Sequence, residues 1–327
     1  MQIRKTLPLP TAPLDYFDDG ATFYLLMPAR AATQIVAFDS EKFETLGTFH
    51  SEEQVFQTSQ YVEDDCMYLI THSGVIGYDS FTGEKLITFD TGSLVPLKMC
   101  SHGEKLFLMC GIPLVSGRSI DTDSVCITVH DKETGKKLLQ SQNMSGSPFA
   151  PIVNDGIWLI VGNILYKYSY DCELEIEIHL QSDAGFDPVF INDWVGVASD
   201  LGTIEFFDRN SGKPISKILV EKNYSPPMVH EGRLYWLTGK ELQKVDVQLS
   251  KYDTICQLEN DVVSTPLLHD DSLYFGDIKG NFIKFDIPTH KYELLPVEDD
   301  ISLWKPVMTS SGNIFVASHG SLHQIED

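Results

Sequence analysis

Histidine is the side chain of this sequence best suited to proton transfer or metal binding near neutral pH. His72, His102 and His319 lie in segments flanked by serine and glycine, and His323 lies inside a short apolar run. None belongs to a G-x-S-x-G, H-E-x-x-H, P-loop or G-x-G-x-x-G motif, which would supply the partners that catalysis or cofactor binding needs. We interpret them as turn and strand residues. We therefore predict no catalytic, cofactor-binding or metal-ligating residue and favour a non-enzymatic protein.

Acidic side chains recur at one place in a repeated pattern. Asp208, Asp246, Asp286 and Glu326 follow one another at steps of 38, 40 and 40 residues, and each ends a short alternating run such as TIEFFD. An aspartate at the first position of a turn can accept a hydrogen bond from a backbone N–H two residues on. A catalytic residue is expected once in a chain, whereas a turn former is expected in every repeat. We predict that the aspartates at the ends of these runs form turns.

A recurring proline marks the same repeat. The prolines, separated by 37, 39, 39 and 40 residues, are Pro151, Pro188, Pro227, Pro266 and Pro306. After each come apolar residues, a polar turn and a second apolar run, as in PLLHDDSLYFGD. A period near 40 residues made of short alternating runs is typical of a repeat unit with four antiparallel strands.

The polar turns indicate eight repeats. They lie near Asp19-Gly20, Asp64-Asp65, His102-Gly103, Asp155-Gly156, Asn192-Asp193, Glu231-Gly232, Asp270-Asp271 and Ser311-Gly312. The eighth repeat has three strands, and residues 1–9 can supply its fourth strand, which closes a ring and removes two exposed sheet edges. We predict an all-β, eight-bladed β-propeller of four-stranded antiparallel blades, a single domain over residues 1–327. Seven blades is the alternative.

Charge and cysteine usage restrict the partners and the compartment. The 47 acidic and 24 basic residues give a formal net charge of −23, which argues against nucleic acid and against anionic membrane surfaces as partners. The sequence lacks the long apolar run of a membrane-inserted helix, an apolar signal core and a lipid-attachment cysteine near its start. The six cysteines are scattered without a C-x-x-C pair: Cys66, Cys100, Cys110, Cys126, Cys172 and Cys256. We predict buried, reduced thiols and a cytoplasmic protein.

The repeats resemble the PQQ-type propeller repeat of the quinoprotein-like superfamily. PLLHDDSLYFGDIKGNFIKFD and PVFINDWVGVASDLGTIEFFDRNSG carry the resemblance, which covers nearly the whole chain and is strongest from Pro151 onward. It implies a propeller fold, but the superfamily includes both quinone-dependent dehydrogenases and non-enzymatic scaffolds, among them a lipoprotein of the outer-membrane assembly machine.

The dehydrogenases of that superfamily carry a tryptophan after each Thr-Gly turn, a vicinal cysteine pair beside the quinone and an export signal. This sequence shows none of these features, so the resemblance extends to the fold and not to the quinone-dependent enzymes. Trp158, Trp194 and Trp236 lie instead at or near second strands, where we expect them to pack between blades.

The third repeat breaks the period. It spans 52 residues from Asp79 to Asp131, and its extra residues, 111–123, fall between its second and third strands. In a four-stranded meander, this loop emerges on the same face of the ring as the connections between blades. These segments are rich in carboxylates, so we predict that this face binds a basic protein, with aromatic and arginine side chains as anchors. The predicted partner-binding residues are Arg118, Asp121, Asp123, Asp183, Phe186, Asp187, Tyr224, Glu259, Asp261, Asp299, Asp300 and Trp304.

Two functions remain open from sequence. The first is a non-catalytic scaffold that binds a basic protein partner, in its most concrete form a bacterial immunity protein that neutralises a basic secreted toxin. The second is a small-molecule-binding or metal-binding propeller, with or without enzymatic activity, that uses its central channel. Ca²⁺ or Mg²⁺ would need several carboxylate oxygens to converge, and no spacing in the sequence forces such convergence.

Overall fold

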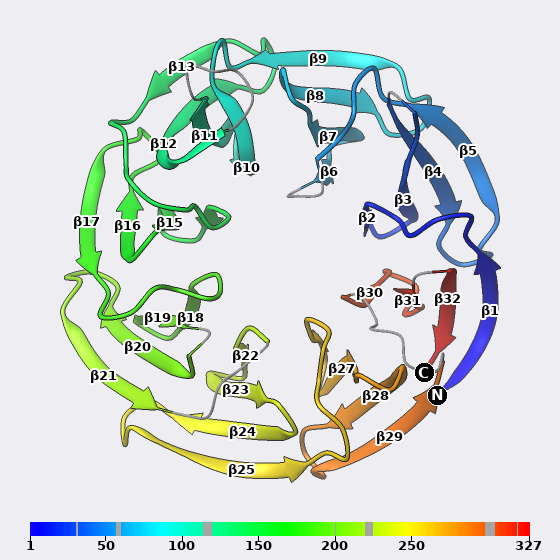
Figure 1. The fold of residues 1–327 in the computed structure, drawn as a ribbon, viewed down its shortest axis with the longest axis vertical. Coiled ribbons are helices and arrows are strands. Elements are labelled where there is room, and N and C mark those ends of the chain that lie inside the picture. Colours follow the sequence, from blue (N-terminus) through cyan, green and yellow to red (C-terminus); the bar gives the residue numbers. More distant parts are fainter. Residues whose placement is uncertain are drawn as a thin grey trace.

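The chain folds into a ring of eight blades, seen down its axis in a computed structural model (Figure 1). The structure describes residues 1–30, 32–56, 60–113, 120–199, 201–219, 225–297, 305–318 and 320–327, with the backbone alone at residues 113 and 120–123. Thirty-two strands in this part form eight sheets, each of four antiparallel strands. The prediction of an eight-bladed β-propeller is confirmed, and the seven-bladed alternative is wrong.

The first four blades follow the chain from the innermost strand to the outermost. Blade 1 contains β2 (Asp15–Asp18), β3 (Thr22–Pro28), β4 (Thr33–Asp39) and β5 (Thr45–His50). Blade 2 contains β6 (Tyr61–Glu63), β7 (Cys66–Ile70), β8 (Gly74–Asp79) and β9 (Lys85–Asp90). Blade 3 contains β10 (Val95–His102), β11 (Lys105–Pro113), β12 (Ile120–Asp131) and β13 (Lys137–Gln140). Blade 4 contains β14 (Ile152–Val153), β15 (Ile157–Val161), β16 (Ile164–Tyr168) and β17 (Leu174–His179).

The next blades repeat this order, and the last one joins the two ends of the chain. Blade 5 contains β18 (Val189–Ile191), β19 (Trp194–Ala198), β20 (Thr203–Asp208) and β21 (Pro214–Leu219). Blade 6 contains β22 (Met228–His230), β23 (Arg233–Thr238), β24 (Glu241–Asp246) and β25 (Lys251–Gln257). Blade 7 contains β26 (Leu267–His269), β27 (Ser272–Gly276), β28 (Asn281–Asp286) and β29 (Lys291–Pro296). Blade 8 contains β30 (Val307–Met308), β31 (Ile314–Ala317), β32 (Ser321–Glu326) and β1 (Gln2–Pro8).

Strand β1 closes the ring as predicted. It pairs antiparallel with β32, from Gln2 opposite Glu326 to Pro8 opposite Ser321. The hydroxyl of Thr6 lies 3.1 Å from Nδ1 of His323, whose side chain is buried. His323 is therefore a packed strand residue, as expected. The third strand of blade 8, β32, is therefore not an exposed sheet edge, because β1 pairs with it.

The aspartates that end third strands form turns, as predicted. Oδ1 of Asp79 accepts the backbone N–H groups of Thr82, at 2.7 Å, and Phe81, at 3.0 Å. Gly83 donates to the Asp79 carbonyl at 2.9 Å and has a φ of 71°. A Cβ at Gly83 would lie 2.4 Å from the ring of Phe49, so glycine is required there by space as well as by backbone angle. Asp131 and Asp208 accept equivalent bonds.

Several outer strands carry an extra residue that has no partner on the third strand. In blade 2, for example, Gly77 is opposite Ile87 and Tyr78 is opposite Lys85, so Leu86 is the extra residue. A bulge of this kind bends and twists a strand, which makes an open edge harder to extend by another chain. The residues at this position in five blades are Leu46, Leu86, Leu138, Glu175 and Ile215.

The hydrophobic core lies mainly between neighbouring blades. Trp158 of β15 packs with Val195 and Phe207 of blade 5, and Trp236 of β23 packs with Phe206 of the same blade. Both indoles are fully buried and donate a hydrogen bond, Trp158 to Asp155 at 2.8 Å and Trp236 to the Ser225 carbonyl at 3.0 Å. Trp194 is partly buried against the same cluster as Trp236. The expected packing of the three tryptophans between blades is confirmed.

The cysteines are thiols set in or beside the core. All six are free, and Cys66, Cys110 and Cys126 are buried. Burial raises the pKa of the Cys100 thiol and that of the Cys110 thiol to about 12. These groups are therefore protonated at neutral pH and are poor nucleophiles and metal ligands. In the described part of the chain, no helix has the length and hydropathy needed to cross a membrane.

Candidate functional site

The connections between blades run beside the turns that join second and third strands. The N–H of Gly185 donates to the carbonyl of Ala198 at the end of β19, at 2.9 Å. The N–H of Ile278, in the turn after β27, donates to the carbonyl of Asp261, also at 2.9 Å. Both kinds of segment therefore lie on one face of the ring, as the alternation of strand direction predicts. We call this the connector face and define it by residues 181–188, residues 259–265 and the hairpin of β11 and β12.

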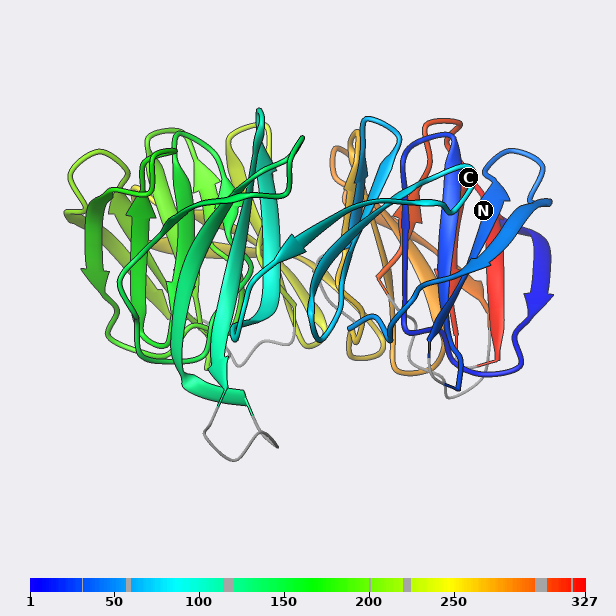
Figure 2. The same ribbon diagram turned by 90° about the horizontal axis from the view of Figure 1, so that it is seen from above.

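The predicted insertion at 111–123 extends this hairpin. Ile112 pairs with Asp121 and Pro113 pairs with Ile120, so the described ends of the insertion are paired strands and not loop. The hairpin projects well beyond the neighbouring blades on one side of the ring (Figure 2). Its tip, which includes Arg118, lies outside the described residues. The insertion is thus a strand-built arm on the connector face.

The predicted partner-binding residues other than Asp187, which is described below, fall into four groups. Asp183, Glu259 and Asp261 are exposed on the connector face. Phe186 is half-buried and packs against the hydrophobic cluster of blades 5 and 6, so only part of its ring faces solvent. Asp121 and Asp123 lie on β12, where the backbone alone is described. Arg118, Tyr224, Asp299, Asp300 and Trp304 lie outside the described residues.

A second group of charged residues lies around the axis of the ring. Asp187 directly precedes Pro188 at the start of β18, and Lys305 directly precedes Pro306 before β30. Each lies four residues before the turn that joins the first and second strands of its blade. This turn begins at Ile191 in blade 5 and at Thr309 in blade 8. First strands are the innermost strands of their blades, and both residues lie just before one (Figure 1).

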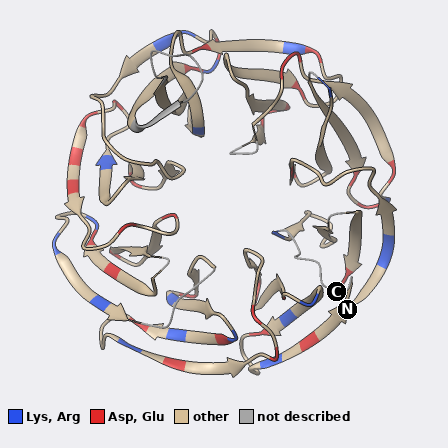
Figure 3. Cartoon of the chain, in the orientation of Figure 1, with Lys and Arg blue, Asp and Glu red and all other residues tan. Residues whose placement is uncertain are grey.

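Two residues of early blades occupy the same position. Asp15 lies four residues before Asp19, whose N–H bonds to the Thr22 carbonyl across the first turn of blade 1. Lys98 of β10 lies four residues before His102, which pairs with Lys105. Basic residues are visible at the inner end of β10 and beside β30 (Figure 3). We call Asp15, Lys98, Asp187 and Lys305 the axial charges.

The axial charges influence one another. Loss of hydration inside the ring raises the pKa of the Asp15 carboxyl and that of the Asp187 carboxyl. Lys98 and Lys305 each act on both carboxyls in the opposite direction. Asp187 is nevertheless exposed to solvent, so protein surrounds its carboxylate without covering it. Lys98 and Lys305 therefore act on both carboxyls although the four residues belong to blades 1, 3, 5 and 8.

Sequence reasoning selected Asp187 for another reason and missed Asp15, Lys98 and Lys305. The signal that could have found Lys305 is its place beside the recurring proline. Tyr16 and Met99 stand where blades 4 to 8 have proline, so Asp15 and Lys98 carry no such marker. Only the pairing of first and second strands reveals their equivalence.

A cavity of about 400 Å³ adjoins Asp15 and Lys305. It lies between the innermost strands of blades 8, 1 and 2, and its polar lining includes Asp18 and Gln60. The hydroxyl of Tyr16 donates to the carbonyl of Lys305, which ties Lys305 to blade 1. Burial raises the pKa of the Asp18 carboxyl, an effect that its bond from Gly20 only partly offsets. The cavity thus combines two carboxylates, an amide and an ammonium group.

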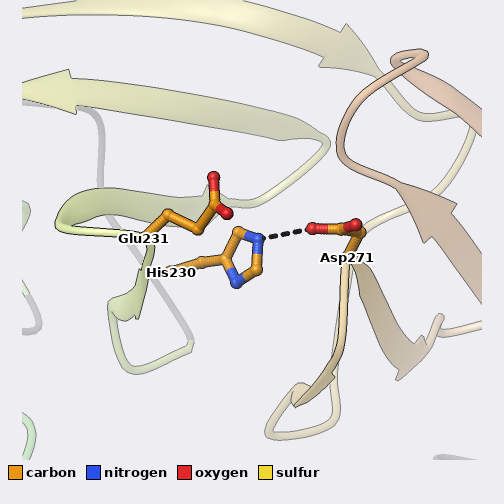
Figure 4. Close-up of side chains that lie close together, drawn as sticks. All are labelled: His230, Glu231 and Asp271. Atoms are coloured by element: carbon orange, nitrogen blue, oxygen red, sulfur yellow. Dashed lines mark hydrogen bonds and ion pairs between the residues drawn. The ribbon is translucent and has the colours of Figure 1, made fainter.

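A cluster between blades 6 and 7 holds the donor types of a metal site. His230 ends β22, Glu231 follows it in the turn, and Asp271 lies in the turn after β26 (Figure 4). One ligand atom from each lies within 4.8 Å of the others, and Nε2 of His230 is 2.9 Å from Oδ1 of Asp271. One nitrogen and two carboxylates suit Zn²⁺. The same contact is also an ion pair between blades, and Asp271 is 59% exposed.

The histidines singled out from sequence lie apart from this cluster. His72 lies in the bend between β7 and β8, as expected, with its ring against Phe56 at a centroid distance of 6.2 Å. His102 ends β10 and was expected in a turn; its ring stacks on Tyr170 of the next blade at 3.8 Å. His319 lies outside the described residues. Within the described residues, neither His72 nor His102 has a side-chain hydrogen bond to a carboxylate.

Comparison with known proteins supports the fold alone. No protein-family model and no curated protein matches the sequence. The computationally designed Ika8 protein matches the structure with a TM-score of 0.75 and 11% identity, over 97% of this chain and 98% of that protein. A europium-containing methanol dehydrogenase matches with a TM-score of 0.71 and 10% identity, over 98% of this chain and 85% of the enzyme. The similarity to the dehydrogenase bears out, at the level of fold, the resemblance to quinoprotein-like propellers.

Proposed function

We propose that this chain is a non-catalytic propeller scaffold that binds a basic protein partner through the connector face. The arm formed by β11 and β12 carries the proposal, because it projects from the same face as the exposed carboxylates of Asp183, Glu259 and Asp261. A projecting hairpin gives a partner additional surface to contact. The acidic surface beside it provides an electrostatic field that attracts a basic partner. The net charge of −23 extends that field beyond the contact.

A toxin-neutralising role is the most concrete form of this proposal. An acidic cap on a basic toxin would associate quickly, since complementary charge speeds encounter and disfavours partners of like charge. The experiment is an affinity pulldown of the tagged protein from its native cytosol at low and moderate salt. Recovery of one basic protein in stoichiometric amount is the expected result.

The variant that tests the face is the triple reversal Asp183→Lys, Glu259→Lys and Asp261→Lys. It should slow association and reduce its salt dependence, because rim charges act mainly on the encounter rate. A matched control reverses three exposed carboxylates on an outer strand or on the opposite face, at Glu84, Glu133 and Asp253. Equal effects of the two triple variants, at equal melting temperature, would show that net charge and not the connector face matters.

A further inference from the structure

The axial charges alternate in sign around the ring and do not neutralise one another by contact. In chain order they are Asp15, Lys98, Asp187 and Lys305, and no ion pair joins any two of them within the described residues. Asp15 and Lys305, which line one cavity without forming an ion pair, leave both signs of charge available to a bound molecule. A ligand with an ammonium and a carboxylate group would match this arrangement.

The adjoining cavity has room for such a molecule. Its volume of about 400 Å³ lies in the range of small-ligand sites, about 300–1,000 Å³. Asp15 and Lys305 belong to both the cavity and the axial charges, so the two features form one continuous site. Tyr61 and Val62 of β6 add an aromatic and an apolar side chain to the lining, which would contact the carbon skeleton of a ligand.

The far end of the cavity presents a second carboxylate. Asp18 ends the strand that Asp15 begins, and three residues of extended strand separate their Cα atoms by about 10 Å. A ligand that places one cation near Asp15 and a second near Asp18 therefore needs a side chain of several bonds. The two carboxylates of the cavity, Asp15 and Asp18, also outnumber its one lysine, Lys305, which favours a ligand with a net positive charge.

Gln60 supplies an observation that does not depend on the charges. Its side chain is 8% exposed and lines the cavity, and its Nε2 donates to the carbonyl of Phe56. Its Oε1 has no hydrogen-bond partner within the described part of the chain. A buried acceptor without a donor is costly. An ammonium or guanidinium group in the cavity would satisfy it.

We propose that this axial cavity binds a free basic amino acid, such as lysine or arginine. Lys305 holds the α-carboxylate, and Asp15 holds the α-ammonium. Asp18 and Gln60 receive the side-chain cation. The site lies at the inner strands of blades 8, 1 and 2, so it neither depends on the proposed protein partner nor excludes it.

The test is isothermal titration calorimetry of the intact, untagged protein with L-lysine and L-arginine. Three analogues separate the contacts: norleucine lacks the side-chain cation, cadaverine lacks the α-carboxylate, and glutamate reverses the side-chain charge. We expect one equivalent of lysine or arginine to bind, norleucine and cadaverine to bind at least tenfold more weakly, and glutamate to give no heat.

Two substitutions locate the ligand. Asp18→Asn should reduce the preference for lysine over norleucine at least tenfold, and Lys305→Met should weaken both amino acids while sparing cadaverine. Asp183→Asn, on the connector face, is the matched control and should leave every affinity unchanged. No binding of lysine or arginine at millimolar concentration would overturn the proposal. Equal binding by Asp18→Asn and the parent protein would also overturn it. Melting temperatures identify any variant that has failed to fold.

Discussion

Lys284 of β28 contacts both carboxylate oxygens of Asp327, at 2.8 Å and 2.6 Å. Tyr274 of β27 donates its hydroxyl to the same carboxylate at 2.7 Å. Burial acts to raise the pKa of Asp327, but the bonds from Lys284 and Tyr274 outweigh it and lower the pKa. This contact fastens blade 7 to the residue that follows β32, next to the seam where the two ends of the chain meet in blade 8.

Breaking this contact should weaken the closure of the ring. Asp327→Asn or Lys284→Met should lower the free energy of unfolding by about 1–2 kcal/mol, as expected for a half-buried, charge-assisted bond. Urea denaturation of both single variants and the double variant measures the coupling. The comparison pair is Lys85 and Glu52, 2.7 Å apart and more exposed, where less than about 1 kcal/mol is expected. Equal losses at both pairs would contradict a special role for the seam.

The turn aspartates should make the protein acid-sensitive. Hydrogen bonds from their own turns lower the pKa values of Asp39, Asp79, Asp131, Asp208 and Asp286. A carboxyl whose folded pKa is lowered stabilises the fold fully above its unfolded pKa, near 4, and loses that contribution as pH falls through the folded value. Melting temperature should therefore fall steeply below about pH 4. The variant Asp79→Asn with Asp131→Asn should flatten this dependence, while Asp183→Asn should not.

The axial carboxylates should behave in the opposite way. Lost hydration raises the pKa of Asp187, so its charged form is less favourable in the folded ring than in the unfolded chain. Asp187→Asn should therefore raise the melting temperature slightly at pH 7. The difference should shrink as pH falls toward the unfolded pKa near 4, because the parent carboxyl then binds a proton more readily when folded. A lower melting temperature for the variant at pH 7 would contradict the account of the axial charges.

The tryptophan between blades 4 and 5 joins the core to a charged network. Trp158 donates to Asp155, which also lies 3.2 Å from Lys167 and 3.7 Å from Arg209 of blade 5. Trp158→Phe should lower the free energy of unfolding by about 2–4 kcal/mol, through lost volume and a lost buried bond. Chemical denaturation measures this effect. Trp194→Phe, at a partly buried site, should lower the free energy of unfolding by less. A larger decrease for Trp194→Phe than for Trp158→Phe would contradict the importance given to Trp158.

The repeat could be predicted from the sequence because its turns and strands depend on residues close together in the chain. A turn such as Asp79 to Gly83 is formed by residues within five positions of one another, so its Asp and Gly signals survive without knowledge of the fold. Alternating strands and a recurring proline are local signals of the same kind. They were sufficient to predict eight blades, their order and the closure by β1.

The bulges of the outer strands and the strand-built arm were not predicted. The bulge at Leu86 depends on how β9 pairs with β8, and either register is compatible with an alternating pattern of side chains. Similarly, residues 111–113 and 120–123 are strand because the two segments pair with each other, with Ile112 opposite Asp121. Pairing across a sheet decides such features, and a sequence pattern does not report it.

The sequence by itself determined the propeller, its repeat and the turn role of the recurring acids, since each rests on interactions between near neighbours in the chain. Only the tertiary structure decided which charged residues line one cavity. Asp15 and Lys305 are separated by 290 positions in the sequence, and they line one cavity because the ring closes between blades 8 and 1. Residues so far apart in the sequence come together because the ring of blades closes. The closure depends on all eight blades, so no single repeat of the sequence predicts it.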